Sequence, residues 1–232
     1  MAGIELFTAP TANGWKVSIA LEECGLDYDT RYVHFANNEQ KTPEFLALNP
    51  NGRIPVIVDN DNQGYVLAES GAILLYLADR EGKLFPVEKN ARFEATQWLM
   101  FQMGGVGPMF GQNGYFQGYC PEDVPVAKAR YHKETKRLYG VLDKRLAKNE
   151  YLAGTEYSIA DVATYPWTHP KQWELHRIDI SEFPNVLRWN KVVSEREAVV
   201  RGIGLMADDQ KVGNPDDETY RNMFGDAQYE KR

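Results

Sequence analysis

The length, composition and charge of the chain already argue against several classes of protein. Its 232 residues are 43% hydrophobic and 12% aromatic, enough to bury a sizeable core in one large domain or two smaller ones. The formal net charge of -7, with no basic block to offset it, argues against nucleic acid as the main partner. No apolar run approaches the roughly 18 residues of a membrane span, and the start, MAGIELF, lacks the pattern of a signal peptide.

The first 80 or so residues alternate strand and helix signals. Strands are expected at 4–7, 28–35, 54–58 and 65–68, and helices at 16–23, 42–48 and 70–80. Thr42 and Pro43 are typical of a helix cap followed by a first turn. The resulting order, β-α-β-α-β-β-α, predicts an α/β layer arrangement. It is too short for a doubly wound dinucleotide fold, and no G-x-G-x-x-G follows the first strand.

After this part the strand signals end and helical periodicity takes over. Helices are expected at 92–109, 126–148, 159–167 and 184–200. We therefore divide the chain into an α/β domain (1–82), a linker (83–90), an all-helical domain (91–206) and an acidic, flexible tail (207–232). Within the tail, four apolar side chains could still dock on the rest of the chain: Tyr220, Met223, Phe224 and Tyr229.

Two short motifs in the first part could bind a ligand. In "NGRIPVIVD", Arg53 and Ile54 precede Pro55, which opens a strand and leaves neighbouring main-chain groups free to pair with another molecule. An ordinary edge-strand proline is the alternative. In "AESGAILLYL", Glu69 and Ser70 stand where a strand turns into a helix, with Ser70 as the expected N-cap. Amides at a helix start attract a carboxylate, so the two motifs together could bind a small acidic peptide; a simple cap is the alternative.

The order of these features resembles the cytosolic glutathione transferases. A thioredoxin-like domain with "RIP" and "ESGAILLYL", followed by an all-helical domain, matches that family over residues 3 to about 205. "YSIADVATYPW" resembles the family's structural capping box, in which Ser158 caps a helix and Asp161 reciprocates. The resemblance implies the thioredoxin-like α/β fold for the first domain, the all-α fold for the second, and a homodimer.

Two further motifs narrow the resemblance to the nu class. "APTANGWKVSIALEE" and "FQMGGVGPMFGQ" are similar to that class, whose first loop places a Thr and an Asn near the glutathione sulfur. These positions match Thr11 and Asn13, the expected catalytic residues. The loop holds no Cys, Ser or Tyr of its own. A thiol with a pKa near about 8.5 is mostly protonated at neutral pH, and a donated O–H or N–H favours its thiolate.

The resemblance also implies a set of glutathione-binding residues. Gln40 matches a contact to the glycine end, while Arg53 and Ile54 match the residues along the cysteinyl backbone. Glu69 and Ser70 match the groups that hold the γ-glutamyl ammonium and carboxylate. Arg130 matches a helical-domain arginine that reaches glutathione, and a solvated helix face is the alternative for it. Trp167 is a further candidate for lining the cleft between the domains.

These expectations lead to a glutathione-dependent disulfide reductase, with weaker conjugation or peroxidase activity. Glutathione is the cosubstrate, and neither a metal nor a membrane is expected to take part. The absence of C-x-x-C argues against a thioredoxin-type dithiol mechanism. Cys24 is interpreted as buried and inert, and Cys120 as a loop thiol that could lie near the cleft. A cytoplasmic location follows from the free thiols and the resemblance. A non-enzymatic, glutathione-binding regulatory protein on the same fold is the alternative.

Overall fold

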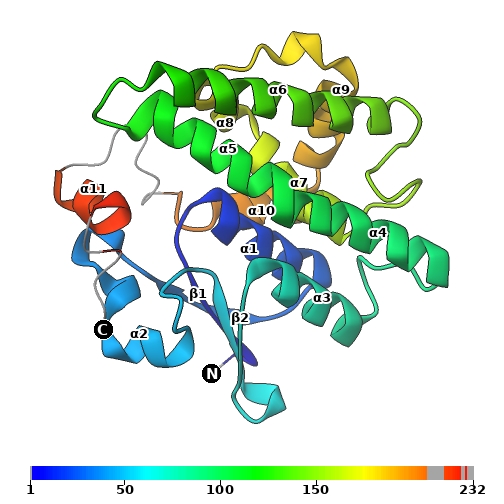
Figure 1. Ribbon diagram of the computed structural model, residues 1–232. Coiled ribbons are helices and arrows are strands. Elements are labelled where there is room, and N and C mark those ends of the chain that lie inside the picture. Colours follow the sequence, from blue (N-terminus) through cyan, green and yellow to red (C-terminus); the bar gives the residue numbers. More distant parts are fainter. Residues whose placement is uncertain (1, 208–216, 226–227, 229–232) are drawn as a thin grey trace.

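The computed structural model describes residues 2–207, 217–225 and 228 of the chain. Figure 1 shows a small sheet at one end of the molecule, a group of helices at the other, and helices α1 (Ala12–Cys24) and α3 (Ser70–Glu81) between them. No helix within the described ranges is long and apolar enough to cross a membrane. On one side of the molecule the last described helix, α11 (Asp217–Phe224), lies beside the short turn Phe35–Asn37 that precedes α2 (Pro43–Leu48).

The first part of the chain is a four-stranded mixed sheet with three helices. The strands are β1 (Ile4–Thr8), β2 (Tyr28–Tyr32), β3 (Val56–Asp59) and β4 (Tyr65–Ala68), in the spatial order β2-β1-β3-β4. β1 pairs parallel with β2 and antiparallel with β3, and β3 pairs antiparallel with β4. The helices are α1 (Ala12–Cys24), α2 (Pro43–Leu48) and α3 (Ser70–Glu81). This is the predicted thioredoxin-like arrangement.

The second part is all-helical, as predicted, but its helices are more divided than the sequence suggests. They are α4 (Lys89–Phe101), α5 (Gly107–Gly114), α6 (Pro125–Leu146), α7 (Ile159–Thr168), α8 (Pro170–His176), α9 (Pro184–Ser194) and α10 (Glu197–Gly204). A π-helical turn at Gln102–Val106 joins α4 to α5. The expected helix over 92–109 is therefore continuous, but one of its turns is wider than an α-helical turn. The expected helix over 184–200 is two helices, because Arg196 adopts an extended conformation.

One hydrophobic core crosses from the sheet into the helical part. It includes Leu6 and Leu21 from the first part and Phe110 and Trp189 from the second. The contact between α1 and α10 is especially close, because a Cβ added at Gly202 would lie 2.7 Å from the backbone of Ile19. Helix α1 is therefore held by both parts of the chain, and residues at its start have a fixed position relative to each.

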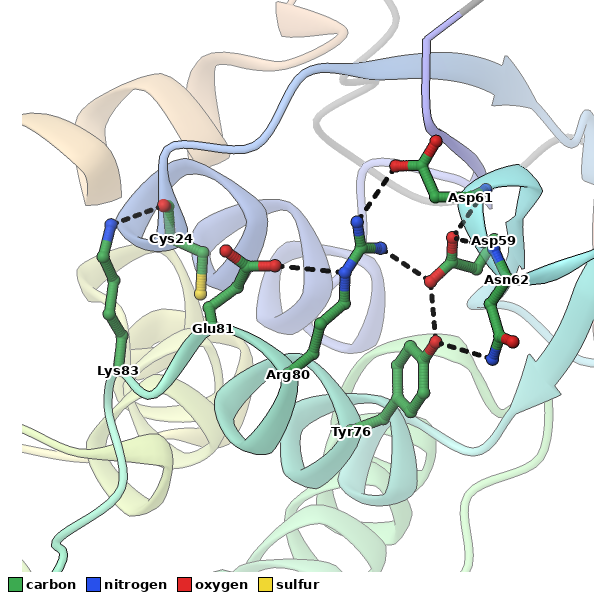
Figure 2. A network of polar contacts seen from close by, with 8 residues as sticks. All are labelled: Cys24, Asp59, Asp61, Asn62, Tyr76, Arg80, Glu81 and Lys83. Atoms are coloured by element: carbon green, nitrogen blue, oxygen red, sulfur yellow. Dashed lines mark hydrogen bonds and ion pairs between the residues drawn. The ribbon is translucent and has the colours of Figure 1, made fainter.

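A buried carboxylate fixes the end of β3 to α3. Asp59 has no exposed surface and accepts hydrogen bonds from the Tyr76 hydroxyl and from Arg80 Nη1, both at 2.6 Å. Arg80 also contacts Asp61 and Glu81, and Figure 2 shows these groups converging on the guanidinium. A buried carboxylate with several charge-assisted partners is well satisfied. This network fixes the position of α3, and therefore of its first residue Ser70, relative to the sheet.

The structure contains the capping box at the start of α7. The Ser158 hydroxyl accepts from Ala160 N at 3.3 Å, and the Asp161 carboxylate accepts from Ser158 N at 3.0 Å. Asp161 also accepts from Leu152 N and from Trp189 Nε1, each at 2.9 Å. The buried carboxylate thus joins the start of α7 to a preceding loop and to α9, which stabilises the helical part rather than a ligand site.

The segment from residue 207 was expected to be a flexible tail, and the structure has a helix in part of it. Residues Asp217–Phe224 form helix α11, although most of the remaining tail, including Tyr229, lies outside the described residues. The Asn222 side-chain amide donates to Phe35 O at 3.1 Å and to Ala36 O at 2.8 Å. The acidic composition of this segment suggested disorder, although α11 also carries apolar side chains that pack on the rest of the molecule.

Candidate functional site

A cavity of about 1240 Å³ lies between the two parts of the chain. Six of the predicted site residues line it together: Thr11, Asn13, Arg53, Ile54, Glu69 and Ser70. Pro55 and Trp167 line it as well. Pockets for one small ligand usually measure about 300–1,000 Å³, so this cavity has room for more than a single small molecule. The structure thus brings most of the predicted residues into one place.

Thr11 caps helix α1 at the inner end of the cavity. Its Oγ1 accepts a hydrogen bond from Gly14 N at 3.2 Å, and its own N–H donates to Ala9 O at 2.7 Å. A hydroxyl has one hydrogen to donate and two lone pairs to accept with, so the cap leaves the hydrogen available to a ligand. The tight turn requires glycine at position 14, because a Cβ there would lie 2.2 Å from Ala9 O.

Asn13 is held by Trp167, which also lines the cavity. The indole Nε1 donates to Asn13 Oδ1 at 3.2 Å. Because this bond uses the carbonyl oxygen, it fixes which end of the amide is the nitrogen and leaves the NH₂ group as a donor. With Thr11, the start of α1 therefore presents two neutral donors and the positive end of a helix dipole. Such a group stabilises an anion such as a thiolate.

A free main-chain edge lies beside these donors. The Ile54–Pro55 peptide bond is cis. Asn49 Nδ2 donates to Arg53 O at 2.7 Å and holds the loop before it. Among the described residues, no partner occupies the N–H or C=O of Ile54. An extended peptide can pair with such an edge through main-chain hydrogen bonds.

The start of α3 differs from its prediction in one respect. Ser70 is the first helical residue rather than the N-cap, and the cap position belongs to Glu69, which makes no side-chain capping bond. Glu69 has φ of 71°, in a region that costs a non-glycine residue about 1–3 kcal/mol and is typical of ligand sites. The helix therefore begins with its amides and the Ser70 hydroxyl directed to the cavity that both residues line.

Two family models match the chain. The glutathione S-transferase N-terminal domain matches residues 2–79, and the glutathione S-transferase C-terminal domain matches residues 115–197. The chain belongs to the glutathione transferase family. Disulfide-bond oxidoreductase YfcG of Escherichia coli (strain K12) is 44% identical over 199 residues, which cover 84% of this chain and 92% of the relative.

Solved structures of family members agree in fold over most of their length. A glutathione transferase from Burkholderia graminis, with two glutathione molecules bound per subunit, is 48% identical with a TM-score of 0.82 and covers 87% of each chain. One from Pseudomonas putida, with one glutathione disulfide bound per subunit, is 42% identical with a TM-score of 0.83. That comparison covers 88% of this chain and 91% of the other.

Lys16 is a residue of the cavity that no sequence motif predicted. Its side chain is almost fully buried, and Nζ donates to Gln102 Oε1 at 2.9 Å and to the Ser70 hydroxyl at 3.4 Å. Burial lowers the pKa of its ammonium group to about 7, while the nearby Glu69 carboxylate acts in the opposite direction. The available signal was its place between Trp15 and Val17, within a helix that is apolar on most sides.

Two predicted residues do not line the cavity. Gln40 is buried outside the cavity lining, and its Nε2 donates to Asn38 Oδ1 at 3.0 Å and to Asn222 O at 3.3 Å. Arg130 lies exposed on α6, so within this chain its side chain is on the solvated helix face that was its alternative interpretation. A contact from Arg130 to a ligand in a partner subunit stays a prediction.

Aromatic side chains form the outer wall of the cavity. Tyr115 and Tyr119 come from the π-helical turn after α5, and Phe224 comes from α11. The Phe224 ring lies 5.5 Å from the Tyr119 ring and stacks on it, and 5.2 Å from the Tyr115 ring. Such a wall favours apolar or flat parts of a second substrate. From the sequence, Phe224 was expected only to dock somewhere on the rest of the chain.

The two thiols lie outside the cavity lining. Cys24 is buried, and burial raises the pKa of its thiol to about 11, which makes it a poor nucleophile. Cys120 is half-buried at the end of the turn that carries Tyr119. In the described part of the chain, no group of three or more acidic, His or Cys side chains is placed to hold a metal ion. The described lining of the cavity therefore offers hydrogen-bond donors and a free main-chain edge rather than a thiol of its own.

Proposed function

We propose that this protein is a nu-class glutathione transferase whose main reaction is the reduction of small disulfides by glutathione. One observation carries the proposal: Thr11 and Asn13 present neutral donors at the start of α1, in a cavity that also holds a free main-chain edge at Ile54. The cavity lining has no cysteine among the described residues. A thiol ligand bound along this edge would therefore supply the nucleophile.

The proposed binding mode follows from the three positions in the cavity. The cysteinyl backbone pairs with the main chain of Ile54, and the γ-glutamyl arm lies at the start of α3. Glu69 binds its ammonium, while Ser70 binds its carboxylate through the amide and hydroxyl. Gln40 binds the glycine end only after its side chain leaves Asn222 O. The sulfur is then directed to Thr11 and Asn13.

The reaction is a pair of thiol–disulfide exchanges. The bound glutathione loses its thiol proton to solvent, and the thiolate attacks one sulfur of the substrate disulfide. A new S–S bond forms, the substrate S–S bond breaks, and the leaving thiolate takes a proton from water. A second glutathione thiolate attacks the mixed disulfide and yields oxidised glutathione and the second thiol. Two glutathiones are oxidised, and the substrate disulfide is reduced to two thiols.

The size of the cavity and the names of relatives support this reaction. The volume of about 1240 Å³ suits two tripeptides better than one. YfcG is named a disulfide-bond oxidoreductase, and the Burkholderia graminis structure holds two glutathione molecules per subunit. Conjugation of electrophiles and reduction of organic hydroperoxides are weaker activities of the same thiolate. We place the protein in the cytoplasm, where glutathione keeps thiols reduced.

We also propose that the protein is a homodimer. Large apolar side chains are exposed on the edge strand β4 and on α4, with Tyr65 45% and Phe93 66% exposed. Exposed apolar side chains of this size are typical of protein interfaces. Sedimentation of the purified protein is expected to give a dimer, and the Phe93→Glu variant is expected to shift it towards monomer. A monomeric wild-type protein would contradict this part of the proposal.

A steady-state assay tests the function. Purified protein is given glutathione and 2-hydroxyethyl disulfide, with glutathione reductase to follow oxidised glutathione, and separately 1-chloro-2,4-dinitrobenzene. Fast disulfide reduction with slow conjugation is expected. The Thr11→Ala and Asn13→Ala variants should lose about tenfold or more in kcat while still binding glutathione by calorimetry. Thr155→Ala and Asn90→Ala, at exposed positions, are matched controls.

Two outcomes would contradict the proposed function. Full reductase rates in both variants would show that the sulfur is bound elsewhere. No turnover of either substrate, with glutathione still bound, would favour the regulatory, non-enzymatic alternative.

A further inference from the structure

Lys16 is a buried amine whose hydrogen-bond partners are all neutral. Its side chain is 1% exposed, and Nζ contacts Gln102 Oε1, the Ser70 hydroxyl and, at 3.7 Å, the Met103 sulfur. In the described ranges, no carboxylate lies within ion-pair distance of it, and Glu69 acts on it only at longer range. Buried charges in proteins are normally paired, and the protonated form of this amine has no such counter-charge among the described residues.

Gln102 holds the ammonium in place and has a second donor without a partner. Its side chain is fully buried, its Oε1 accepts from Lys16, and its Nε2 has no hydrogen-bond partner. The space is narrow, because a Cβ added at Gly107 would lie 2.8 Å from this Nε2. Lys16 and Gln102 both line the cavity, beside Ser70. The cavity therefore has an excess of buried donors at one point, next to the amides that begin α3.

We propose that Lys16 is a glutathione-binding residue that provides the counter-charge for the γ-glutamyl carboxylate. Gln102 positions the ammonium, and Ser70 shares the carboxylate with it through its hydroxyl and amide. The inference rests on the proposed function, because it uses glutathione as the ligand. It adds a positively charged side chain from α1 opposite the γ-glutamyl carboxylate, which neither Glu69 nor Ser70 supplies.

Calorimetry with two ligands tests this role. The first ligand is S-methylglutathione, and the second is the same compound with 4-aminobutyryl in place of γ-glutamyl, so that only the α-carboxylate is missing. Lys16→Met is expected to weaken binding of the first ligand about tenfold or more and to leave binding of the second unchanged. Lys16→Arg should keep most of the preference for the carboxylate. Lys148→Met, at an exposed position, is the matched control.

The ligand comparison separates a binding role from a structural one. An equal loss for both ligands would overturn the proposal, as would unchanged binding of S-methylglutathione by Lys16→Met. If Lys16→Met does not fold, as judged by circular dichroism, Lys16→Gln replaces it and carries the same two expectations. Because neither ligand can react, the outcome does not depend on turnover. If Lys16→Met loses affinity for S-methylglutathione alone, but the wild-type protein reduces no disulfide, the proposed function is contradicted and the role of Lys16 is not.

Discussion

The side-chain oxygen of Asn13 accepts a hydrogen bond at 3.2 Å from the indole N–H of Trp167, and both residues line the cavity. One residue stands at the start of α1 in the first part of the chain, and the other near the end of α7 in the second. The orientation of a proposed catalytic amide is thereby set by the helical part. The donor that we propose for the glutathione sulfur therefore depends on a residue far away in the sequence.

Removing this hydrogen bond should slow the reaction without abolishing binding. In Trp167→Phe the Asn13 amide can rotate, so kcat for disulfide reduction is expected to fall about fivefold, the effect of one lost hydrogen bond. The dissociation constant of glutathione should change little. Steady-state kinetics and calorimetry measure the two quantities. Trp98→Phe is the control, because the Trp98 indole donates to Glu94 instead. An unchanged kcat in Trp167→Phe would show that Asn13 needs no such support.

Gly14→Ala should destabilise the protein through the loop that carries Thr11. The added methyl group would lie 2.2 Å from Ala9 O and 2.4 Å from Thr8 Oγ1, so the backbone must move. We expect the free energy of unfolding to fall by about 3 kcal/mol, as measured by urea denaturation. Gly140→Ala, where nothing lies within 4 Å of the new atom, should instead stabilise α6 by up to about 1 kcal/mol. Equal effects of the two changes would contradict this interpretation of the turn.

The burial of Lys16 predicts a dependence of stability on pH. Burial lowers the pKa of its ammonium group from the ordinary value of 10.5 to about 7 in the folded protein. Below pH 7 the folded and unfolded proteins both hold the proton, and the full burial penalty applies. Between the two pKa values the unfolded protein binds more protons, so stability rises with pH by at most about 1.4 kcal/mol per pH unit. From pH 6 to pH 9 the wild-type protein should therefore gain stability relative to Lys16→Met, as measured by their free energies of unfolding. A constant difference would show that Lys16 does not titrate in this range.

Phe224 should limit the size of the second substrate. Its ring packs on Tyr115 and Tyr119 at the outer wall, and its removal would enlarge the cavity. In Phe224→Ala, kcat/KM for a bulky aromatic disulfide is expected to rise several-fold relative to that for 2-hydroxyethyl disulfide. Competition between the two substrates in one assay measures this ratio directly. An unchanged ratio would show that α11 does not contact the second substrate.

Local patterns in the sequence were enough to predict the strands and most helices. Strand β4 and the start of α3 follow from short apolar runs and clear turn residues, and their observed bounds agree closely with the prediction. The break at Arg196 was missed because apolar residues continue across it with helical spacing. Helix α11 was missed because its acidic surroundings resemble those of a disordered segment.

Residues of the candidate site were predictable only where they belong to a short sequence motif. The loop with Thr11 and Asn13 and the start of α3 are short continuous stretches, and both line the cavity. The contacts of Lys16 join α1 to the turn at Gln102, 86 residues away in sequence, and no local pattern reports such a pairing. The bond from Trp167 to Asn13 is of the same kind.

The close contact of Gly202 with Ile19 has a consequence for how the protein unfolds. Family models divide the chain in two, but α1 is enclosed by helices from both sides and one core runs through the boundary. Separating the halves would expose apolar side chains of α1 and α3 to water at a cost that neither half can offset alone. Both halves should therefore melt together in a single cooperative transition, and a fragment that ends after α3 should lack a stable tertiary structure.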